Sequence, residues 1–570
     1  MLSSLSLAVA LLATTAAASC SSKGSKKPNF IFIMTDDQDM LMNSLSYQPA
    51  VQKHFADKGT WFKKHFCTVS QCCPSRVSLL TGKAAHNTNV TDVMPPYGGY
   101  PKFVSQGLND NYLPIWLQQA GYNTYYTGKL INSHSVTTYN NPFPKGWNGS
   151  DFLIDPGTYV YYNSCMTRNN EPYAWHPGQY STDLIASKAV GFLEDAIAAK
   201  DRPFFLGVAP IGPHGEVLVS DNTPYFLDPV PADRHKDLFP GVKVPRTPNF
   251  NPDTPGTASY LKSAPRLSQK EIEYGDEYYR KRLQALQAVD DLVDSIVTRL
   301  EADPDVLANT YLIYTADNGY HISQHRLPPG KTCNIEEDIN IPFFIRGPGV
   351  AKGAVQTFPT SHTDIVPTLF TLAGIPLHDD FDGEPIPVTH KMMARSKPKS
   401  EHVNVEFWGT TLKEGNIYNS TSFLNNTFKH VRVIGDGYDL AFAVWCTMDH
   451  ELYDMTADPY QMTNLYGTSG RIAEWSIPKL TARLNGLLLT LKACKGQVCT
   501  RPWKKLHPQD NVKNLRQAMN ARYDDFYEEQ QHRVTFSECA LGQILAYEGA
   551  LEPIPYGAGG KRAARWEDWT

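Results

Sequence analysis

The sequence predicts an α/β fold: a large mixed, mainly parallel sheet between helices, followed by a smaller α+β domain with an antiparallel sheet. Three continuous apolar runs, at residues 29–34, 203–209 and 310–315, are typical of strands buried on both faces of a sheet. An amphipathic pattern over 280–300 predicts a helix that covers such a sheet. Two further runs, at 428–434 and 439–445, are expected to pair as strands of the smaller domain.

Composition limits the classes of function that need be considered. The chain has 570 residues and is 41% hydrophobic, which is enough for one large core or two smaller ones. The net charge is −5 and the pI about 6.4, so no basic surface points to a nucleic acid or an anionic membrane. Ten cysteines are too few at this length for a disulfide scaffold. We therefore expect a globular protein without a nucleic-acid partner.

The N-terminus has the pattern of a secretory signal. Residues 1–19 contain an apolar stretch from Leu7 to Ala13 and then small residues, which predicts a signal peptide. Cys20 raises a lipoprotein alternative, which is disfavoured because Ala17 stands where a leucine is usual. No later run is long enough for a membrane span, so we expect a secreted, extracellular protein, with a vacuolar or lysosomal compartment as the alternative.

Four sequons agree with export, and we expect N-glycosylation at each. Their asparagines are Asn89, Asn148, Asn419 and Asn425. In an oxidising compartment, Cys494 and Cys499 are the expected local disulfide. The remaining pairings cannot be deduced from spacing.

The stretch from Cys72 to Gly82 predicts a two-turn helix. Pro74 suits the first turn because its missing N–H is not needed there, and Gly82 suits the left-handed end. We place Cys72 just ahead of this helix, where the helix dipole would lower the pKa of its thiol. Arg76 lies four residues on, so its guanidinium can rise beside position 72 and hold an anionic oxygen.

Oxygen donors follow two of the predicted buried strands. Asp36 and Asp37 come after the run at 29–34, and Asp317 and Asn318 come after the run at 310–315. Ligands bind at the carboxyl ends of strands in open α/β sheets, so these four side chains form one site if the strands are neighbours. With three carboxylates and one amide, Ca²⁺ or Mg²⁺ fits this set better than zinc. The alternative is a pair of solvated turn aspartates.

Two more candidates follow strands, and a third lies in a loop. Lys129 ends a predicted short strand, His214 follows the strand at 203–209, and Lys331 lies in Pro329-Gly330-Lys331. Taken alone, each is more simply explained as a surface lysine or a structural histidine.

The whole set resembles one family. Cys72-Cys73-Pro74-Ser75-Arg76 with Leu80-Thr81-Gly82 is similar to the signature of type I sulfatases, and the resemblance extends over about residues 28–495. It implies an alkaline-phosphatase-like sandwich and hydrolysis of organic, most simply aryl, sulfate esters. It also implies that a formylglycine-generating enzyme converts Cys72 to formylglycine (3-oxoalanine).

The resemblance implies roles for individual residues. Cys72, Arg76, Lys129, His214, His321 and Lys331 are the implied catalytic residues, and Asp36, Asp37, Cys72, Asp317 and Asn318 the implied calcium ligands. One position departs from the family. The usual Gly-Lys-x-His is here Gly128-Lys129-Leu130-Ile131, so the histidine is missing, and Asn132 or His134 is the candidate to lie nearby.

The resemblance also indicates the expected domains and the alternative functions. We expect a catalytic domain over 28–385, and a smaller C-terminal domain with a tail over 400–570 to which no chemistry is assigned. The resemblance is to fungal arylsulfatases and to glucosamine-6-sulfatases, so an N-acetylglucosamine-6-sulfatase acting on glycans is one alternative. A phosphodiesterase or phosphonate hydrolase of the same superfamily is another. An inactive secreted calcium-binding glycoprotein is a third.

Overall fold

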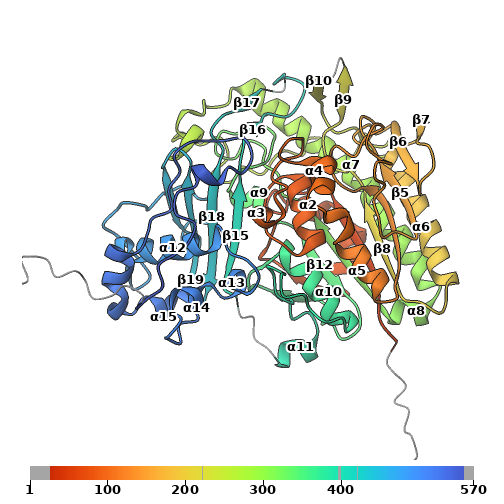
Figure 1. The fold of residues 1–570 in the computed structure, drawn as a ribbon. Coiled ribbons are helices and arrows are strands. Elements are labelled where there is room, and N and C mark those ends of the chain that lie inside the picture. The colour runs from red at the N-terminus through yellow and green to blue at the C-terminus, as the bar shows by residue number, and fades with distance from the viewer. Residues whose placement is uncertain (1–25, 221–222, 396–399, 420, 558–570) are drawn as a thin grey trace, which may run out of the picture.

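The structure is a computed structural model that describes residues 26–220, 223–395, 400–419 and 421–557. The predicted signal peptide over 1–19 and Cys20 lie outside these ranges. Within them, the chain forms a larger part around a long sheet and a smaller C-terminal part around a second sheet, which lie side by side (Figure 1).

A ten-stranded sheet forms the centre of the larger part. The five middle strands of this sheet run parallel to one another, and antiparallel pairs lie towards both of its edges. The predicted mixed, mainly parallel sheet is therefore confirmed. The strand order is β13 (Ala354–Gln356), β2 (Thr60–Phe62), β12 (Phe343–Arg346), β11 (Thr310–Ala316), β1 (Asn29–Thr35), β8 (Phe204–Ala209), β4 (Asn123–Lys129), β5 (Gly149–Leu153), β6 (Asn163–Arg168) and β7 (Ala174–Pro177).

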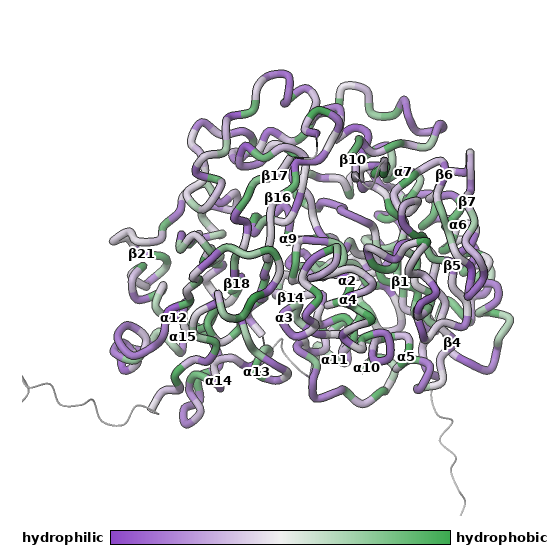
Figure 2. Tube along the Cα trace, turned by 45° about the horizontal axis from the view of Figure 1, so that its top comes forward, coloured by the Kyte–Doolittle hydropathy of each residue, from purple (hydrophilic) through white to green (hydrophobic). Residues whose placement is uncertain are grey.

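The three apolar runs of the sequence are the central strands β1, β8 and β11. Side chains alternate across β1, so that Phe30, Phe32 and Met34 enter one hydrophobic core while Ile31 and Ile33 enter another. Both faces of the strand are thus buried, which is the physical reason for its continuous apolar sequence. Figure 2 shows hydrophobic positions along the inner segments and hydrophilic ones mainly on the outer loops.

Helices cover both faces of the sheet and complete the sandwich. One core includes residues of α2 (Cys72–Thr81), α5 (Leu113–Gln119) and α10 (Ile365–Ala373). The other includes α6 (Ser181–Ala198) and α7 (Gln269–Glu301). The predicted helix over 280–300 is the later part of α7. The helix begins earlier because Ser268 and Glu271 form a capping box that satisfies its first N–H groups.

The smaller part contains the predicted antiparallel strands. Its sheet has the order β15 (His402–Phe407), β18 (Phe428–Gly435), β19 (Tyr438–Trp445) and β20 (His450–Asp454), and all neighbours are antiparallel. Helix α12 (Ile477–Leu491) packs into the same core as β18 and β19. The tail beyond residue 500 contributes Trp503, Tyr527 and Phe536 to that core, so it is a structural part of this unit.

The two parts share a buried boundary. Val405 and Phe407 of β15 pack in one core with Phe66 and Ile339 of the larger part. The buried Arg432 of β18 donates to Glu336 Oε2 across the boundary over 2.9 Å. In the segment expected to separate the domains, His390–Arg395 forms the helix α11.

Two disulfides lie in the smaller part. Cys494 and Cys499 form the expected local bridge. Cys446 bonds to Cys539 and ties the tail to the end of β19, a pairing that spacing could not reveal. No helix in the described ranges is long and apolar enough to cross a membrane.

Short elements complete the chain. The remaining helices are α1 (Pro49–Val51), α3 (Ala85–Thr88), α4 (Gly99–Ser105), α8 (Pro304–Ala308), α9 (Glu336–Ile339), α13 (Gln497–Thr500), α14 (Pro502–Leu506) and α15 (Leu515–Ala518). The remaining strands pair as β3 (His65–Phe66) with β14 (Thr360–Ser361), β9 (Val217–Ser220) with β10 (Thr223–Phe226), β16 (Thr411–Leu412) with β17 (Ser422–Phe423), and β21 (Arg471–Ile472) with β22 (Trp475–Ser476).

Replacing Gly128 near the end of β4 tests this packing. Gly128 has φ +104°, and a Cβ there would lie 2.1 Å from the carbonyl oxygen of Ala209 on β8. We expect Gly128→Ala to lower the free energy of unfolding by at least about 2 kcal/mol, since it adds a backbone clash to the strain of a positive φ. Gly121, at φ +89° in open space, is the matched control, and Gly121→Ala should cost only about 1 kcal/mol. Equal losses in urea unfolding would contradict the close approach.

Candidate active site

The four predicted oxygen donors converge at the carboxyl ends of β1 and β11. The two strands pair in parallel from Asn29 opposite Thr310 to Thr35 opposite Ala316, so the residues that follow them are neighbours. The backbone N–H of Asp37 donates to Asp317 Oδ1 over 3.0 Å, and Asn318 Nδ2 donates to Asp37 Oδ1 over 2.8 Å. Asp37 adopts a left-handed φ of 64°, a conformation uncommon for any residue but glycine, and this turn places its carboxylate beside the others.

Helix α2 brings Cys72 against these carboxylates. Gln71 is the N-cap and Cys72 the first helical residue, so the helix begins one residue earlier than predicted. Gly82 ends the helix at φ 67°, as expected. Cys72 Sγ lies 3.3 Å from Asp36 Oδ1 and 3.8 Å from Asp37 Oδ1.

The prediction of a lowered thiol pKa at Cys72 is wrong. Burial and the charge of Asp36 raise the pKa well above its usual range, and the cations of Lys129 and Lys331 offset only part of this effect. The sequence indicated the helix end, whose dipole favours a thiolate, but not the buried carboxylate that opposes it.

Three buried cations surround the same point. Arg76 Nε donates to Asp317 Oδ2 over 2.8 Å, and Lys129 Nζ donates to Asp36 Oδ2 over 2.5 Å. Lys331 Nζ contacts both oxygens of Asp37, at 2.5 and 2.6 Å, and lies 3.2 Å from Cys72 Sγ. The structure therefore brings all three predicted cationic residues to Cys72.

The pairing of these charges sets their protonation. Burial alone would raise the pKa of Asp36, but the charges of Lys129, His214 and Arg76 outweigh it and hold that pKa well below its usual range. Burial likewise raises the pKa of Asp37, and Lys331 and His214 reverse the shift. Both carboxylates are therefore ionised at neutral pH.

His214 lies at the end of β8 with one ring nitrogen turned towards the carboxylates. Its Nδ1 is 2.6 Å from the carbonyl oxygen of Gly215, which fixes Nδ1 as the protonated nitrogen. Nε2 lies 3.4 Å from Asp37 Oδ2 and is the atom free to exchange a proton within the site.

His321 is placed differently. Its Nδ1 pairs with Asp338 Oδ1 over 2.8 Å, and its backbone exchanges hydrogen bonds with Gly330, the residue before Lys331. Within the described residues, His321 has no polar side-chain contact with Cys72 or with the carboxylates at the ends of β1 and β11. The geometry gives it a part in holding the Lys331 loop.

Asn132, one of the two candidates after Lys129, is linked to the site by Tyr159, which it contacts and which lies beside His214. Asn132 Nδ2 donates to the Tyr159 hydroxyl over 2.7 Å. The Tyr159 ring lies 4.3 Å from the ring of His214, and Lys129 Nζ is 4.7 Å from its centroid. His134, the other candidate, is buried against Tyr100 instead. Sequence patterns did not indicate Tyr159, because it lies in a loop that carries no motif.

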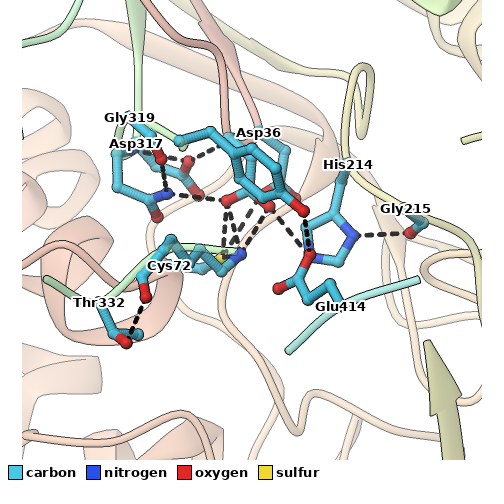
Figure 3. Close-up of polar contacts among 12 residues, drawn as sticks. Asp36, Cys72, His214, Gly215, Asp317, Gly319, Thr332 and Glu414 are labelled. Carbon is cyan, nitrogen blue, oxygen red and sulfur yellow. Dashed lines mark hydrogen bonds and ion pairs between the residues drawn. The ribbon is translucent and has the colours of Figure 1, made fainter. Parts of the chain in front are cut away.

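Glu414 is a second residue beside the site that sequence patterns did not indicate. It lies in the loop between β16 and β17, in the C-terminal part, and its side chain is drawn with the site in Figure 3. The Tyr320 hydroxyl donates to Glu414 Oε2 over 2.7 Å. Nothing in the local sequence connects this glutamate with residues 94 positions earlier.

The site has the donors that a hard divalent cation requires. Asp36, Asp37, Cys72 and His214 offer ligand atoms that all lie within 4.8 Å of one another. Asn318 Oδ1 is buried and has no hydrogen-bond partner in the described part of the chain, which is costly for an amide oxygen unless a ligand contacts it. The residues therefore fit such a cation, and oxygen donors favour calcium or magnesium over zinc.

The asparagines of the four sequons lie on the surface. Asn89, Asn148, Asn419 and Asn425 are all exposed. Each is therefore accessible to a glycosylating enzyme.

Comparisons with known proteins agree on one family. A model of the Sulfatase family matches residues 28–375. Sulfatase ppz1 of Metarhizium majus is 52% identical over 411 residues, which cover 72% of this chain and 89% of that protein. An arylsulfatase of Volvox carteri is 38% identical over 549 residues, covering 91% of this chain and 83% of its own. Human N-acetylglucosamine-6-sulfatase is 29% identical over 512 residues, covering 84% of this chain and 87% of its own.

Solved structures share the fold. A protein in complex with its substrate, D-glucosamine-2-N,6-O-disulfate, superposes with a TM-score of 0.60 at 23% identity, covering 78% of this chain and 94% of that one. The phosphonate monoester hydrolase of Silicibacter pomeroyi superposes with a TM-score of 0.52 at 17% identity, covering 77% and 91%.

Acid should destabilise the folded protein through Asp36 and Asp37. Their pKa values are lowered by folding, so their contribution is complete above the unfolded value of about 4 and is lost as the pH falls through the folded values. We expect the free energy of unfolding, measured with urea in chelator, to fall below about pH 4, and to fall less steeply in Asp36→Asn. Asp305→Asn, at an exposed carboxylate, should keep the native slope. An unchanged slope in Asp36→Asn would contradict the assigned ion pairs.

Proposed function

This chain belongs to the sulfatase family and is a sulfuric ester hydrolase, and we propose that it cleaves aryl sulfate esters with a formylglycine made from Cys72. The observation that carries the proposal is the position of Cys72, buried at the start of α2 between three carboxylates and three cations. The aryl preference is supported by the arylsulfatases of Volvox carteri and Chlamydomonas reinhardtii, at 38% and 37% identity.

The raised thiol pKa supports a modified residue. Burial and Asp36 raise the pKa of Cys72, so an unmodified thiol is scarcely ionised at neutral pH and is a poor nucleophile there. Hydrated formylglycine supplies one hydroxyl that attacks sulfur and a second that allows sulfate to leave, which a thiol cannot do. We propose that a formylglycine-generating enzyme makes this change before the chain folds, because position 72 is buried afterwards.

The cations around position 72 bind the sulfate group. Arg76, Lys129 and Lys331 stabilise the negative charge on its oxygens as the ester bond breaks. All three are nearly or fully buried, so their charges act with little screening by solvent.

His214 protonates the leaving oxygen. Because Nδ1 donates to Gly215, the proton that is exchanged sits on Nε2, which faces the cluster. Tyr159 and Asn132 hold this ring in place, while His321 and Asp338 hold the loop of Lys331.

Asp36, Asp37, Asp317 and Asn318, together with position 72, would hold one Ca²⁺, with Mg²⁺ as the weaker candidate. When bound, such an ion would supply Lewis-acid polarisation of a sulfate oxygen and would favour the ionised form of the nucleophile.

Secretion and glycosylation complete the proposal. They are supported by the N-terminal signal pattern, by two disulfides that require an oxidising compartment, and by the exposed sequon asparagines. Relatives in Caenorhabditis elegans and Drosophila melanogaster are described as extracellular sulfatases.

Peptide mass spectrometry tests the modification. In protein from a eukaryotic secretory host, the tryptic peptide from His65 to Arg76 should carry an aldehyde at position 72 that an aldehyde reagent traps. Cys72→Ala should lower kcat/KM for an aryl sulfate by at least about 10⁴-fold, because the nucleophile is gone. An unmodified cysteine in every copy of an active enzyme would overturn the proposal. Faster turnover of the matching aryl phosphate or phosphonate would favour the phosphoester alternatives.

Calcium should stabilise the folded protein through the same site. After chelation, adding Ca²⁺ at about 100 times its Kd should raise the free energy of unfolding by about 2.7 kcal/mol, and Tm with it. Asn318→Ala should weaken this response, whereas Asn309→Ala, at the other end of β11, should leave it unchanged. A Tm that does not depend on Ca²⁺ or Mg²⁺ would contradict the metal site.

A further inference from the structure

Glu414 brings the C-terminal part of the chain into the wall of the active site. The residue is buried, and its backbone N–H donates to the Pro329 carbonyl over 2.8 Å, directly before the loop of Lys331. A Cβ on Gly330 would lie 2.7 Å from the carbonyl oxygen of Leu412, so β16 packs closely against that loop. The segment that carries Glu414 is therefore held beside the proposed sulfate-binding lysine.

One oxygen of Glu414 is fixed by Tyr320. The Tyr320 hydroxyl donates to Oε2 over 2.7 Å, and the Tyr278 hydroxyl lies 3.0 Å behind it. The ring of Tyr320 is parallel to the ring of Tyr278, with centroids 6.2 Å apart, and the guanidinium of Arg282 lies 3.9 Å from the Tyr320 centroid. Because Tyr320 cannot move freely, the plane of the Glu414 carboxylate is set.

The loop itself is fixed at a second point. The backbone N–H of Asn416 donates to the Tyr274 hydroxyl over 2.7 Å. That hydroxyl in turn donates to Asp228, which forms an ion pair with Lys281 at 2.8 Å. The carboxylate of Glu414 is thus pre-organised from both sides, as a recognition group requires.

The other oxygen of Glu414 is available to a ligand. Oε1 has no hydrogen-bond partner in the described part of the chain, and it is not among the polar atoms that are sealed from solvent. Glu414 also forms no ion pair within 4.0 Å among the described residues. Its charge still acts on the site, because burial lowers the pKa of Lys331 while Asp37, Cys72 and Glu414 raise it. Oε1 of this nearly buried carboxylate therefore receives no hydrogen bond from the described residues, and a donor on a ligand could supply one.

A sulfate group cannot be the partner of this oxygen, since both are anionic. The group that fits is a hydrogen-bond donor on the alcohol that leaves. In the view of Figure 3, Glu414 and His214, the proposed acid for that alcohol, both project to the same side of Cys72. A second anionic group at that point of the substrate would be repelled by the carboxylate.

We propose that Glu414 is a specificity-determining residue that accepts a hydrogen bond from a hydroxyl or amine group next to the sulfate ester. The preferred substrates are then monosulfate esters of diols, dihydroxyaromatics or amino alcohols. This inference rests on the proposed function and names the leaving group on which that function acts. Tyr320 is a positioning residue, because it acts only by orienting Glu414.

Matched substrates separate this role from a purely structural one. We would measure kcat/KM for 2-hydroxyphenyl and 2-methoxyphenyl sulfate, and for the corresponding 3-substituted pair, with native enzyme and with Glu414→Leu. Each rate is normalised to formylglycine content. The hydroxy-to-methoxy ratio is compared between enzymes, so the intrinsic reactivity of each ester cancels.

We expect the ratio to fall about 10- to 100-fold in Glu414→Leu for at least one pair, as for the loss of a hydrogen bond to a charged group. Tyr320→Phe should lower it by a smaller factor. Glu529→Leu, at an exposed glutamate in the same part of the chain, should leave it unchanged. Ratios that agree within twofold between native enzyme and Glu414→Leu for both pairs would overturn the inference.

Two further results keep the test decisive. If Glu414→Leu does not fold, Glu414→Gln replaces it, because an amide of the same shape removes the charge and should still reduce the ratio at least threefold; an unchanged ratio would overturn the inference. Native enzyme that fails to cleave even phenyl sulfate would overturn the proposed function and this inference with it. If native enzyme cleaves phenyl sulfate but the hydroxy-to-methoxy ratio is the same in Glu414→Leu, only the inference about Glu414 would be overturned, and the proposed function would stand.

Discussion

The site depends on the mutual neutralisation of buried charges at the ends of two parallel strands. Asp36, Asp37 and Asp317 would be too costly to bury alone, and so would the cations that face them. Burial raises the pKa values of Asp36 and Asp37, but the lysines that contact them reverse this shift, so both are ionised. Asp317 pairs with Arg76 in the same cluster. The parallel register of β1 and β11 makes this possible, since it places the two aspartate-bearing turns next to each other.

This charge balance makes an unmodified thiol at position 72 a poor nucleophile, which supports the proposed formylglycine. A helix N-terminus would favour a thiolate, but the adjacent Asp36 and the burial of the sulfur act in the opposite direction and dominate. The same surroundings suit a group that donates a proton and carries little charge before reaction. A divalent cation among the carboxylates would free part of the charge on Lys129 and Lys331 for an anionic substrate.

The smaller part of the chain contributes to the site as well as to stability. Its sheet shares a core with the larger part, and its disulfide from Cys446 to Cys539 fixes the tail against β19. The loop after β16 extends from this base to the Lys331 loop and carries Glu414. In the proposed mechanism, the sulfate-binding residues therefore come from the larger part, and the smaller part supplies Glu414 as the proposed contact for the leaving group.

The sequence by itself determined the central strands, the helix at position 72 and the residues that carry charge. Continuous apolar runs, Pro74 and Gly82 act locally, so their patterns are readable without a structure. Only the tertiary structure decided the direction of the thiol pKa shift at Cys72, the pairing of His321 with Asp338, and the contacts of Tyr159 with His214 and of Glu414 with Tyr320. These properties depend on contacts between segments far apart in sequence, where loops without periodic pattern are positioned by packing and by buried charge.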